Sequence, residues 1–267
     1  MRLPSLGQLI WQLWTLPFLL SLSFAQIQVP IRMDRSMTNS IGQPVYFYSL
    51  VMDFPYQAVL SDKQLAWLAK EAYTAMMALP VGITKADDPP LLKRPAVMSA
   101  LRVDRVGVPG TTVYFASSMR RDIQAERKTY MTKIKVQSFP GGITQGPEAA
   151  ELEGACHACQ VTHTGGHGHD LKCGEPLALT AFYKAEKPND GNPWEQMKKR
   201  NLLMAAYSGE HEKIIKPCTV NVEGKTYGCM QLLDKLEVEW VAEGTAMEPV
   251  TSADPLRPNP QICLGSK

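Results

Sequence analysis

The sequence predicts an α/β fold, because short runs of β-forming residues alternate along it with segments of helical periodicity. The strand-like runs are residues 44–52, 96–103, 111–117 and 237–241, and the helical segments begin at 61, 173 and 229. With 45% apolar and 20% charged residues, the chain has the composition of a globular protein and not of a disordered one. Its formal net charge of +2 gives little electrostatic reason for strong, sequence-independent binding to a polyanion.

Residues 1–25 have the three features of a secretory signal peptide. Arg2 supplies a positive charge, the stretch from Leu9 to Leu22 is mostly apolar, and Ser23-Phe24-Ala25 places small residues where a signal peptidase cleaves. The apolar stretch is shorter and more interrupted than the roughly 20 residues that a membrane-spanning helix needs. We therefore expect a secreted protein that begins at about Gln26 and has no membrane contact after cleavage.

Residues 26–94 are expected to form an N-terminal strand-helix extension. Residues 26–43 indicate an extended arm, and the run PVYFYSLVM at 44–52 indicates a strand. Ser61, with Gln64 three residues later, has the pattern of a capping box, and an apolar stripe continues from there until Pro80. We interpret this helix as core packing.

Residues 95–241 are expected to form the main domain. It begins with the runs at 96–103 and 111–117, which are separated by glycine and proline and are typical of an antiparallel hairpin. The segment 120–135 carries charges of both signs and is predicted to be a solvated helix or an insertion.

Two helices are predicted next in the main domain. The apolar pattern from Cys173 to Tyr183 predicts the first. Asn192 as N-cap, with Pro193 at the first helical position, predicts a second helix that runs to about Tyr207.

The rest of the chain is predicted to contain short elements and a tail. Residues 211–216 end in a short strand that leads into Pro217-Cys218. A short helix at 229–236 and a strand at 237–241 follow, and residues 242–267 form a Pro-rich C-terminal tail.

All six cysteines lie in the second half of the chain, at positions 156, 159, 173, 218, 229 and 263. A secreted chain enters an oxidising compartment, so complete pairing as disulfides is the simplest interpretation. Disulfide frameworks usually staple small domains, however, and this chain is long enough to be stabilised by burial.

Cys173, Glu175, Cys218 and Cys229 have the pattern of a zinc hydrolase. The Cys-x-Glu opens one helix, Pro217-Cys218 ends a strand, and Cys229 opens the next helix. Three thiolates leave a fourth tetrahedral position for water, whose pKa the metal lowers. A carboxylate two residues from the first ligand cannot easily bind the same ion, but it can transfer the proton of that water.

This pattern resembles the zinc-dependent nucleobase and nucleoside deaminase superfamily, whose signature is His/Cys-x-Glu with Pro-Cys-x-x-Cys. The resemblance covers about Pro95 to Val241, and the predicted hairpin at 96–117 occupies the place of two strands that precede the family's Glu-bearing helix. It implies a three-layer α/β/α cytidine deaminase-like sheet with the N-terminal strand and helix packed on it.

The resemblance also implies roles for single residues. Cys173, Cys218 and Cys229 would bind Zn²⁺, and Glu175 would be the catalytic proton shuttle while water attacks an amino-bearing ring carbon. The substrate would be a nucleoside or a single-stranded nucleic acid. Ten residues separate Cys218 from Cys229, where the family has two, so a loop with a turn at Gly224 has to bulge out between the ligands.

A second cluster contains Cys156, Cys159, His163, His167 and His169. A Cys-x-x-Cys pair followed closely by histidines can hold a second metal ion. A disulfide between Cys156 and Cys159 is the alternative. A further alternative places His169 in the first zinc site instead of Cys173.

Two other functions compete with a secreted deaminase, which would act as a toxin or effector. One is a non-enzymatic secreted interaction protein stapled by disulfides. The other is a structural zinc-binding protein that uses the segment from Cys156 to His169.

Overall fold

The computed structural model describes residues 27, 29–34, 45–54, 59–79, 94–105, 109–118, 120–121, 173–185, 200–222 and 225–250. Several predicted features lie outside these residues, among them the signal peptide at 1–25, most of the charged segment at 120–135, the cluster from Cys156 to His169 and the helix start at Asn192.

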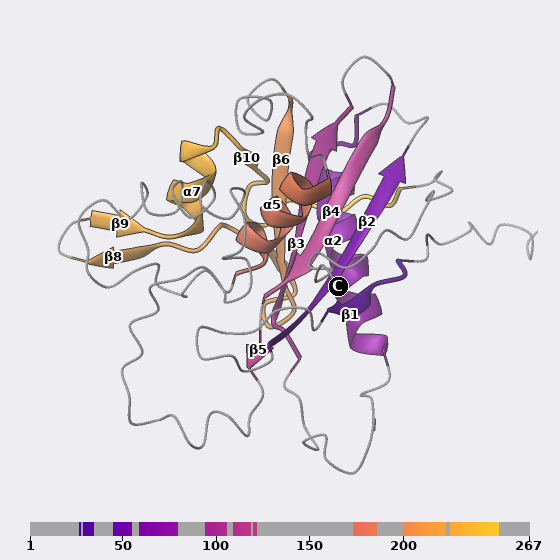
Figure 1. Cartoon of the computed structure of the whole chain (residues 1–267), viewed down its shortest axis with the longest axis horizontal. Coiled ribbons are helices and arrows are strands. Elements are labelled where there is room, and N and C mark those ends of the chain that lie inside the picture. Colours follow the sequence, from indigo (N-terminus) through magenta and orange to yellow (C-terminus); the bar gives the residue numbers. More distant parts are fainter. Residues whose placement is uncertain are drawn as a thin grey trace, which may run out of the picture.

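Eight of the described strands form one large mixed sheet. They are β1 (Arg32–Asp34), β2 (Val45–Phe54), β3 (Val97–Asp104), β4 (Thr111–Ser117), β5 (Arg120–Arg121), β6 (Leu202–Ser208), β7 (Lys213–Ile215) and β10 (Glu239–Trp240). This 8-stranded sheet has the order β1-β2-β4-β3-β6-β10, with β5 paired to β2 and β7 paired to β6 (Figure 1). Strand β10 runs parallel to β6, and the other pairs are antiparallel. A mixed α/β fold is thereby confirmed.

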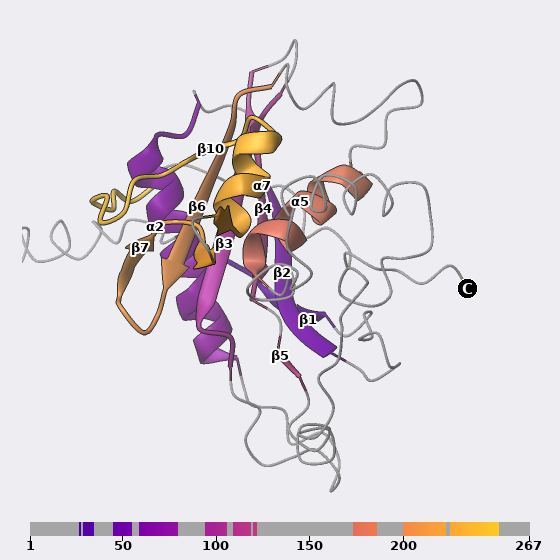
Figure 2. The same cartoon turned by 90° about the vertical axis from the view of Figure 1, so that its left-hand side faces the viewer.

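Side chains of the central strands alternate between two buried clusters, one on each face of the sheet. In β4, Tyr114 belongs to one cluster and Phe115 to the other. Helix α2 (Asp62–Ala78) packs on the face of Phe115. Helices α5 (Gly174–Ala185) and α7 (Cys229–Lys235) pack on the face of Tyr114. The sheet therefore lies between helices on both faces, as Figure 2 shows for α2 and α5.

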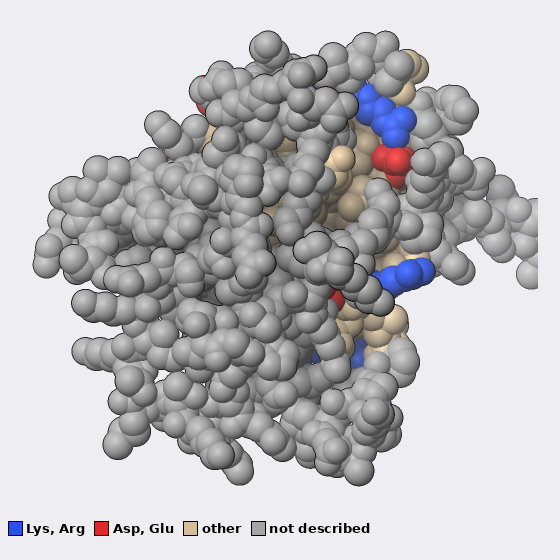
Figure 3. All heavy atoms as spheres, in the orientation of Figure 1, with Lys and Arg blue, Asp and Glu red and all other residues tan. Residues whose placement is uncertain are grey.

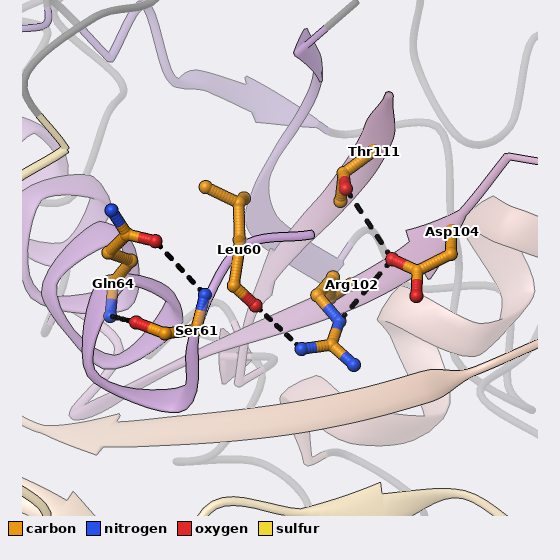
Figure 4. A network of polar contacts seen from close by, with 6 residues as sticks. All are labelled: Leu60, Ser61, Gln64, Arg102, Asp104 and Thr111. Carbon is orange, nitrogen blue, oxygen red and sulfur yellow. Dashed lines mark hydrogen bonds and ion pairs between the residues drawn. The ribbon is translucent and has the colours of Figure 1, made fainter. Parts of the chain in front are cut away.

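The predicted capping box begins helix α2. The Ser61 hydroxyl accepts a hydrogen bond from the Gln64 N–H at 3.3 Å, and the Gln64 side chain accepts one from the Ser61 N–H at 3.0 Å (Figure 4). These two bonds satisfy donors that the first helical turn leaves without intrahelical acceptors. The apolar side of the helix is buried against the sheet, so its predicted role in core packing is confirmed.

A buried arginine ties the sheet to the start of α2. Arg102 on β3 is 5% exposed and donates a hydrogen bond to the Leu60 carbonyl at 2.6 Å. Its Nε lies 3.6 Å from Oδ1 of Asp104, which also accepts a 3.4 Å hydrogen bond from Thr111 (Figure 4). A buried guanidinium needs such partners, because an unpaired buried charge is strongly destabilising.

Both ends of the described chain join the same core. Strands β1 and β2, which were predicted as an arm and a strand of the N-terminal extension, extend the sheet beyond β4. In the predicted C-terminal tail, Val250 is buried and the Glu248 N–H donates to the Lys63 carbonyl at 3.1 Å. Residues 242–250 thus pack beside α2, and residues 251–267 lie outside the described part of the chain.

The predicted helix that ends near Tyr207 is wrong over its second part. Leu202–Ser208 is the strand β6, which pairs with β3 on one side and with β10 and β7 on the other. Its sequence LLMAAYS is buried along its whole length. A strand that is covered on both faces has a continuous apolar sequence. The periodicity of such a sequence does not distinguish the strand from a buried helix.

The surface of the described residues has no dominant charge. Figure 3 shows basic and acidic atoms lying interspersed on one face, with no broad patch of a single sign among the described residues. Within the same residues, none of the helices combines the length and the apolar character needed to cross a bilayer.

Candidate metal centre

The Cys-x-Glu segment is seated directly on the sheet. Cys173 immediately precedes α5, and Glu175 lies in the first turn of that helix. A Cβ atom at Gly174 would lie 2.5 Å from the Ala116 carbonyl oxygen and 2.6 Å from the Ser99 hydroxyl oxygen. Both distances are well below van der Waals contact, so the absence of a side chain at Gly174 allows the helix start to approach β3 and β4 this closely.

The residues between Cys218 and Cys229 form a β-hairpin. Strand β8 (Val220–Val222) pairs antiparallel with β9 (Lys225–Tyr227), and the pairing starts at Val220 and Tyr227. The two ends of the hairpin therefore lie next to each other, and the eight residues 220–227 form an insertion between them. Without them the sequence would read Cys-Thr-Gly-Cys, which is a Cys-x-x-Cys spacing. The predicted turn at Gly224 lies outside the described residues.

Backbone contacts hold Cys218 against the start of α7. The Cys229 N–H donates to the Cys218 Sγ at 3.3 Å, and the Met230 N–H donates to the Cys218 carbonyl at 3.3 Å. Gly228 has a φ of 142°, and a Cβ atom there would overlap the carbonyl oxygen of Cys218. Gly228 is therefore required both by its backbone conformation and by this close approach.

Together these elements bring the three predicted ligands into one group. The Sγ atoms of Cys173, Cys218 and Cys229 all lie within 4.8 Å of one another. Those of Cys173 and Cys218 are 3.5 Å apart. A disulfide has an S–S distance of about 2.05 Å, so these two sulfurs are not bonded to each other, and none of the three cysteines is in a disulfide.

The three sulfurs fit a zinc ion. Zinc–sulfur bonds of about 2.3 Å in tetrahedral geometry place ligand sulfurs about 3.8 Å apart, which is close to the 3.5 Å between Cys173 and Cys218 and below the 4.8 Å that bounds all three separations. Thiolates are ligands that zinc prefers. Cys229 is fully buried, whereas Cys173 and Cys218 are partly exposed. Three protein ligands are the number found in catalytic zinc sites, which keep a position open.

Neighbouring groups and burial raise the pKa of two of the three thiols, Cys173 and Cys229. The hydrogen bond with Cys218 is the main cause that raises the pKa of Cys173, although a bond with Cys229 acts in the opposite direction. Burial is the main cause that raises the pKa of Cys229. The charge of Glu175 is a lesser cause that raises the pKa of both thiols. A bound divalent cation would reverse these effects and favour the thiolates.

Glu175 itself is only 3% exposed, in the first turn of α5. A carboxylate is rarely buried to this extent in a protein unless it has partners or a chemical role. Its position two residues after Cys173 keeps it beside the sulfurs without making it one of the three grouped ligands.

The structure also identifies residues that the sequence analysis did not single out. Gly174 and Gly228 let the chain approach closely beside two of the ligands, and Ser99 lies beneath the first of them. In the sequence, the two glycines are marked only by their position next to a cysteine, and nothing marks Ser99. The second predicted cluster, from Cys156 to His169, is not among the described residues.

A comparison of the chain with protein-family models, with curated proteins and with solved structures finds no match.

Proposed function

We propose that this chain is a zinc-dependent hydrolytic deaminase that acts on an amino-bearing base in a nucleoside or a single-stranded nucleic acid. One observation carries the proposal: Glu175, a carboxylate that is only 3% exposed, lies two residues after Cys173, whose sulfur is within 4.8 Å of those of Cys218 and Cys229. A three-thiolate zinc site with a non-ligating glutamate is the arrangement that the zinc deaminases use.

The hairpin between the ligands supports the proposal. With β8 and β9 regarded as an insertion, residues 217–219 and 228–229 read Pro-Cys-x-x-Cys, as in the superfamily signature. The order of elements agrees as well, since the antiparallel strands β3 and β4 precede the helix that bears Glu175. Helices on both faces of the sheet are consistent with a three-layer, cytidine deaminase-like fold.

In this mechanism zinc, when bound, supplies a Lewis acid that lowers the pKa of water to near neutrality. The three cysteines would hold the metal between Cys218 and the starts of α5 and α7. Glu175 accepts a proton from the attacking water and donates it to the departing amino group, acting first as base and then as acid. The net reaction consumes one water, replaces the ring amino group by a carbonyl and releases ammonia.

The setting of Glu175 suits proton transfer. Gly174 brings the start of α5 into close contact with β3 and β4. This contact limits how far the Glu175 carboxylate can move relative to Cys173. A proton shuttle has to stay within hydrogen-bonding reach of both the water and the leaving group, so such rigidity favours catalysis.

The proposal also includes secretion of the enzyme and the kind of substrate it acts on. The signal peptide predicted at residues 1–25 supports a secreted enzyme, and a secreted deaminase would act as a toxin or effector. The net charge of +2 and the mixed surface in Figure 3 favour a free nucleoside or a short single-stranded region over tight, sequence-independent binding to long nucleic acid.

The test is zinc analysis combined with an ammonia-release screen over nucleosides and single-stranded oligonucleotides. Wild-type protein purified without chelator should contain near-stoichiometric zinc, which Cys218→Ser should lose and Glu175→Gln should keep. Glu175→Gln should nevertheless lose at least about a hundred-fold in rate, the usual contribution of general acid–base catalysis.

Matched controls are Cys263→Ser for the ligand and Glu210→Gln, at an exposed position, for the carboxylate. Both should keep zinc and activity. Stoichiometric zinc with no ammonia from any base would support a structural zinc protein instead. A zinc-free protein with all six cysteines oxidised would support the disulfide-stapled interaction protein.

A further inference from the structure

Ser99 places a buried hydroxyl beneath the Cys-x-Glu segment. It pairs with Ala116 on β4 and with Ala206 on β6. Because Leu101, two residues further along β3, belongs to the cluster under α5, strand alternation puts Ser99 on the same face. Its Oγ is the side-chain atom closest to the position that a Cβ of Gly174 would occupy, at 2.6 Å. Ser99 therefore lies directly under the residue between Cys173 and Glu175.

Packing alone does not explain a serine at this position. Ser99 is 0% exposed, and its hydroxyl has no hydrogen-bond partner within the described part of the chain. A buried hydroxyl that lacks a partner lowers stability, whereas an alanine fills nearly the same space without that cost. The neighbours of Ser99 in this row, Ala116 and Ala206, are alanines and are buried as well.

We propose that Ser99 is a positioning residue of the metal centre, whose hydroxyl forms a hydrogen bond with the Cys173–Glu175 segment when the three cysteines hold zinc. This rests on the metal-binding part of the proposed function. The sulfurs of Cys173 and Cys218 are 3.5 Å apart, so a spacing of about 3.8 Å in a tetrahedral site requires these two residues to separate slightly.

The chemistry of both partners suits such a bond. Backbone N–H groups in the first turn of a helix have no intrahelical acceptor, and Pro176 removes one of these donors from α5. A serine hydroxyl can accept from a backbone N–H and can also donate to a carboxylate or carbonyl oxygen. Because Ser99 already lies against Gly174, only a small rearrangement of the segment is needed to bring one of its polar groups within reach of the hydroxyl.

The test compares Ser99→Ala with wild type in two measurements, the stability of the metal-free protein and the zinc dissociation constant obtained by competition with a chromogenic chelator. We expect the metal-free variant to be as stable as wild type or more stable. We expect its zinc dissociation constant to rise about three- to ten-fold, which is the contribution of one neutral hydrogen bond.

Ser117→Ala is the matched control. Ser117 is also buried on β4, but its hydroxyl already accepts from the Tyr48 N–H at 2.8 Å and donates to the Ser118 carbonyl at 3.0 Å. Removing it should lower the stability of the metal-free and zinc-loaded forms equally and leave zinc affinity unchanged.

An unchanged zinc affinity in Ser99→Ala, with equal effects on both forms, would show a merely structural role and overturn the proposal. The outcome for the proposed function is separate. Wild-type protein that binds zinc but releases no ammonia would refute the deaminase, while a weaker affinity in Ser99→Ala would still support the positioning role. Wild-type protein that binds no zinc would refute both.

Discussion

Replacing Gly174 with alanine should damage the metal centre more than the fold. The new Cβ would lie 2.5 Å from the Ala116 carbonyl oxygen, 2.6 Å from the Ser99 hydroxyl oxygen and 3.0 Å from the Ser99 Cβ. The nearest of these atoms belongs to the backbone of a central strand and cannot rotate away. The start of α5 would have to retreat by about 1 Å to restore van der Waals contact, and it would carry Cys173 and Glu175 with it.

Two opposing effects decide the stability of Gly174→Ala. Overpacking a buried site costs about 1–3 kcal/mol. Alanine has a helix propensity better than that of glycine by about 1 kcal/mol, which offsets part of this loss at the first helical position. We therefore expect a net loss of about 0–2 kcal/mol from the same two terms, and a variant that still folds.

Zinc affinity should fall further than stability does. Metal ligands have to be held within about 0.5 Å of their binding geometry, so a 1 Å displacement of Cys173 exceeds that tolerance. Loss of supporting contacts around a metal typically weakens binding 10- to 100-fold, and we expect roughly this increase in the zinc dissociation constant. Chelator competition measures the affinity, and thermal unfolding of the metal-free protein measures stability.

Gly209→Ala is the control for this experiment. A Cβ at Gly209 would collide with the ring of Tyr73, a side chain of α2 on the opposite face of the sheet. This variant should lose stability and keep its zinc affinity. If Gly174→Ala binds zinc as tightly as wild type, the close approach of α5 to the sheet does not position the ligands, and the reasoning is refuted.

Three further predictions follow from the same structure. Deleting residues 220–227 leaves Cys-Thr-Gly-Cys and should preserve zinc binding, because β8 and β9 begin and end at one place; loss of the metal would mean that the hairpin itself shapes the site. Metal-free protein treated with oxidised glutathione should form a disulfide between Cys173 and Cys218, whose sulfurs are 3.5 Å apart, and release two reduced glutathione molecules. Peptide mapping that finds a different disulfide, or loss of the disulfide when a cysteine other than these two is replaced, would contradict this. Burial first, and then the charge of Glu212, raise the pKa of Tyr207, so the folded protein keeps a proton that the unfolded chain loses above about pH 10. The free energy of unfolding, measured by chemical denaturation, should thus fall as the pH rises through that range. An equally steep decline in Tyr207→Phe would refute this assignment.

Local signals in the sequence predicted the elements that depend on local interactions. The capping box of Ser61 and Gln64 fixes the start of α2, and the alternating runs on either side of Gly110 predict β3 and β4. The cysteine pattern likewise predicted which three cysteines would meet, because helices were correctly expected to start at Cys173 and Cys229, and the strand expected before Pro217-Cys218 ends nearby at Ile215. These features are encoded by neighbours in the chain.

Features that depend on distant contacts were not predictable in the same way. Leu202–Ser208 reads as helix or strand until its partners β3 and β10 are known. The segment 26–43 contains the edge strand β1, which was expected only as an extended arm. The role of Ser99 depends on its position under Gly174, more than 70 residues along the chain, and no local pattern reports such a contact.

The hairpin between Cys218 and Cys229 has a consequence for the entropy of the unliganded chain. Lengthening a flexible connection between two ligands from two residues to ten would add about 1.4 kcal/mol of loop-closure free energy. Cross-strand pairing from Val220 to Tyr227 brings the ends of the connection together before any ion arrives and so removes most of that penalty. The distance between ligands along the chain is thereby decoupled from their distance in space. A coordination motif can then accept an insertion during evolution while its affinity stays nearly constant, and a search for fixed spacing would miss it.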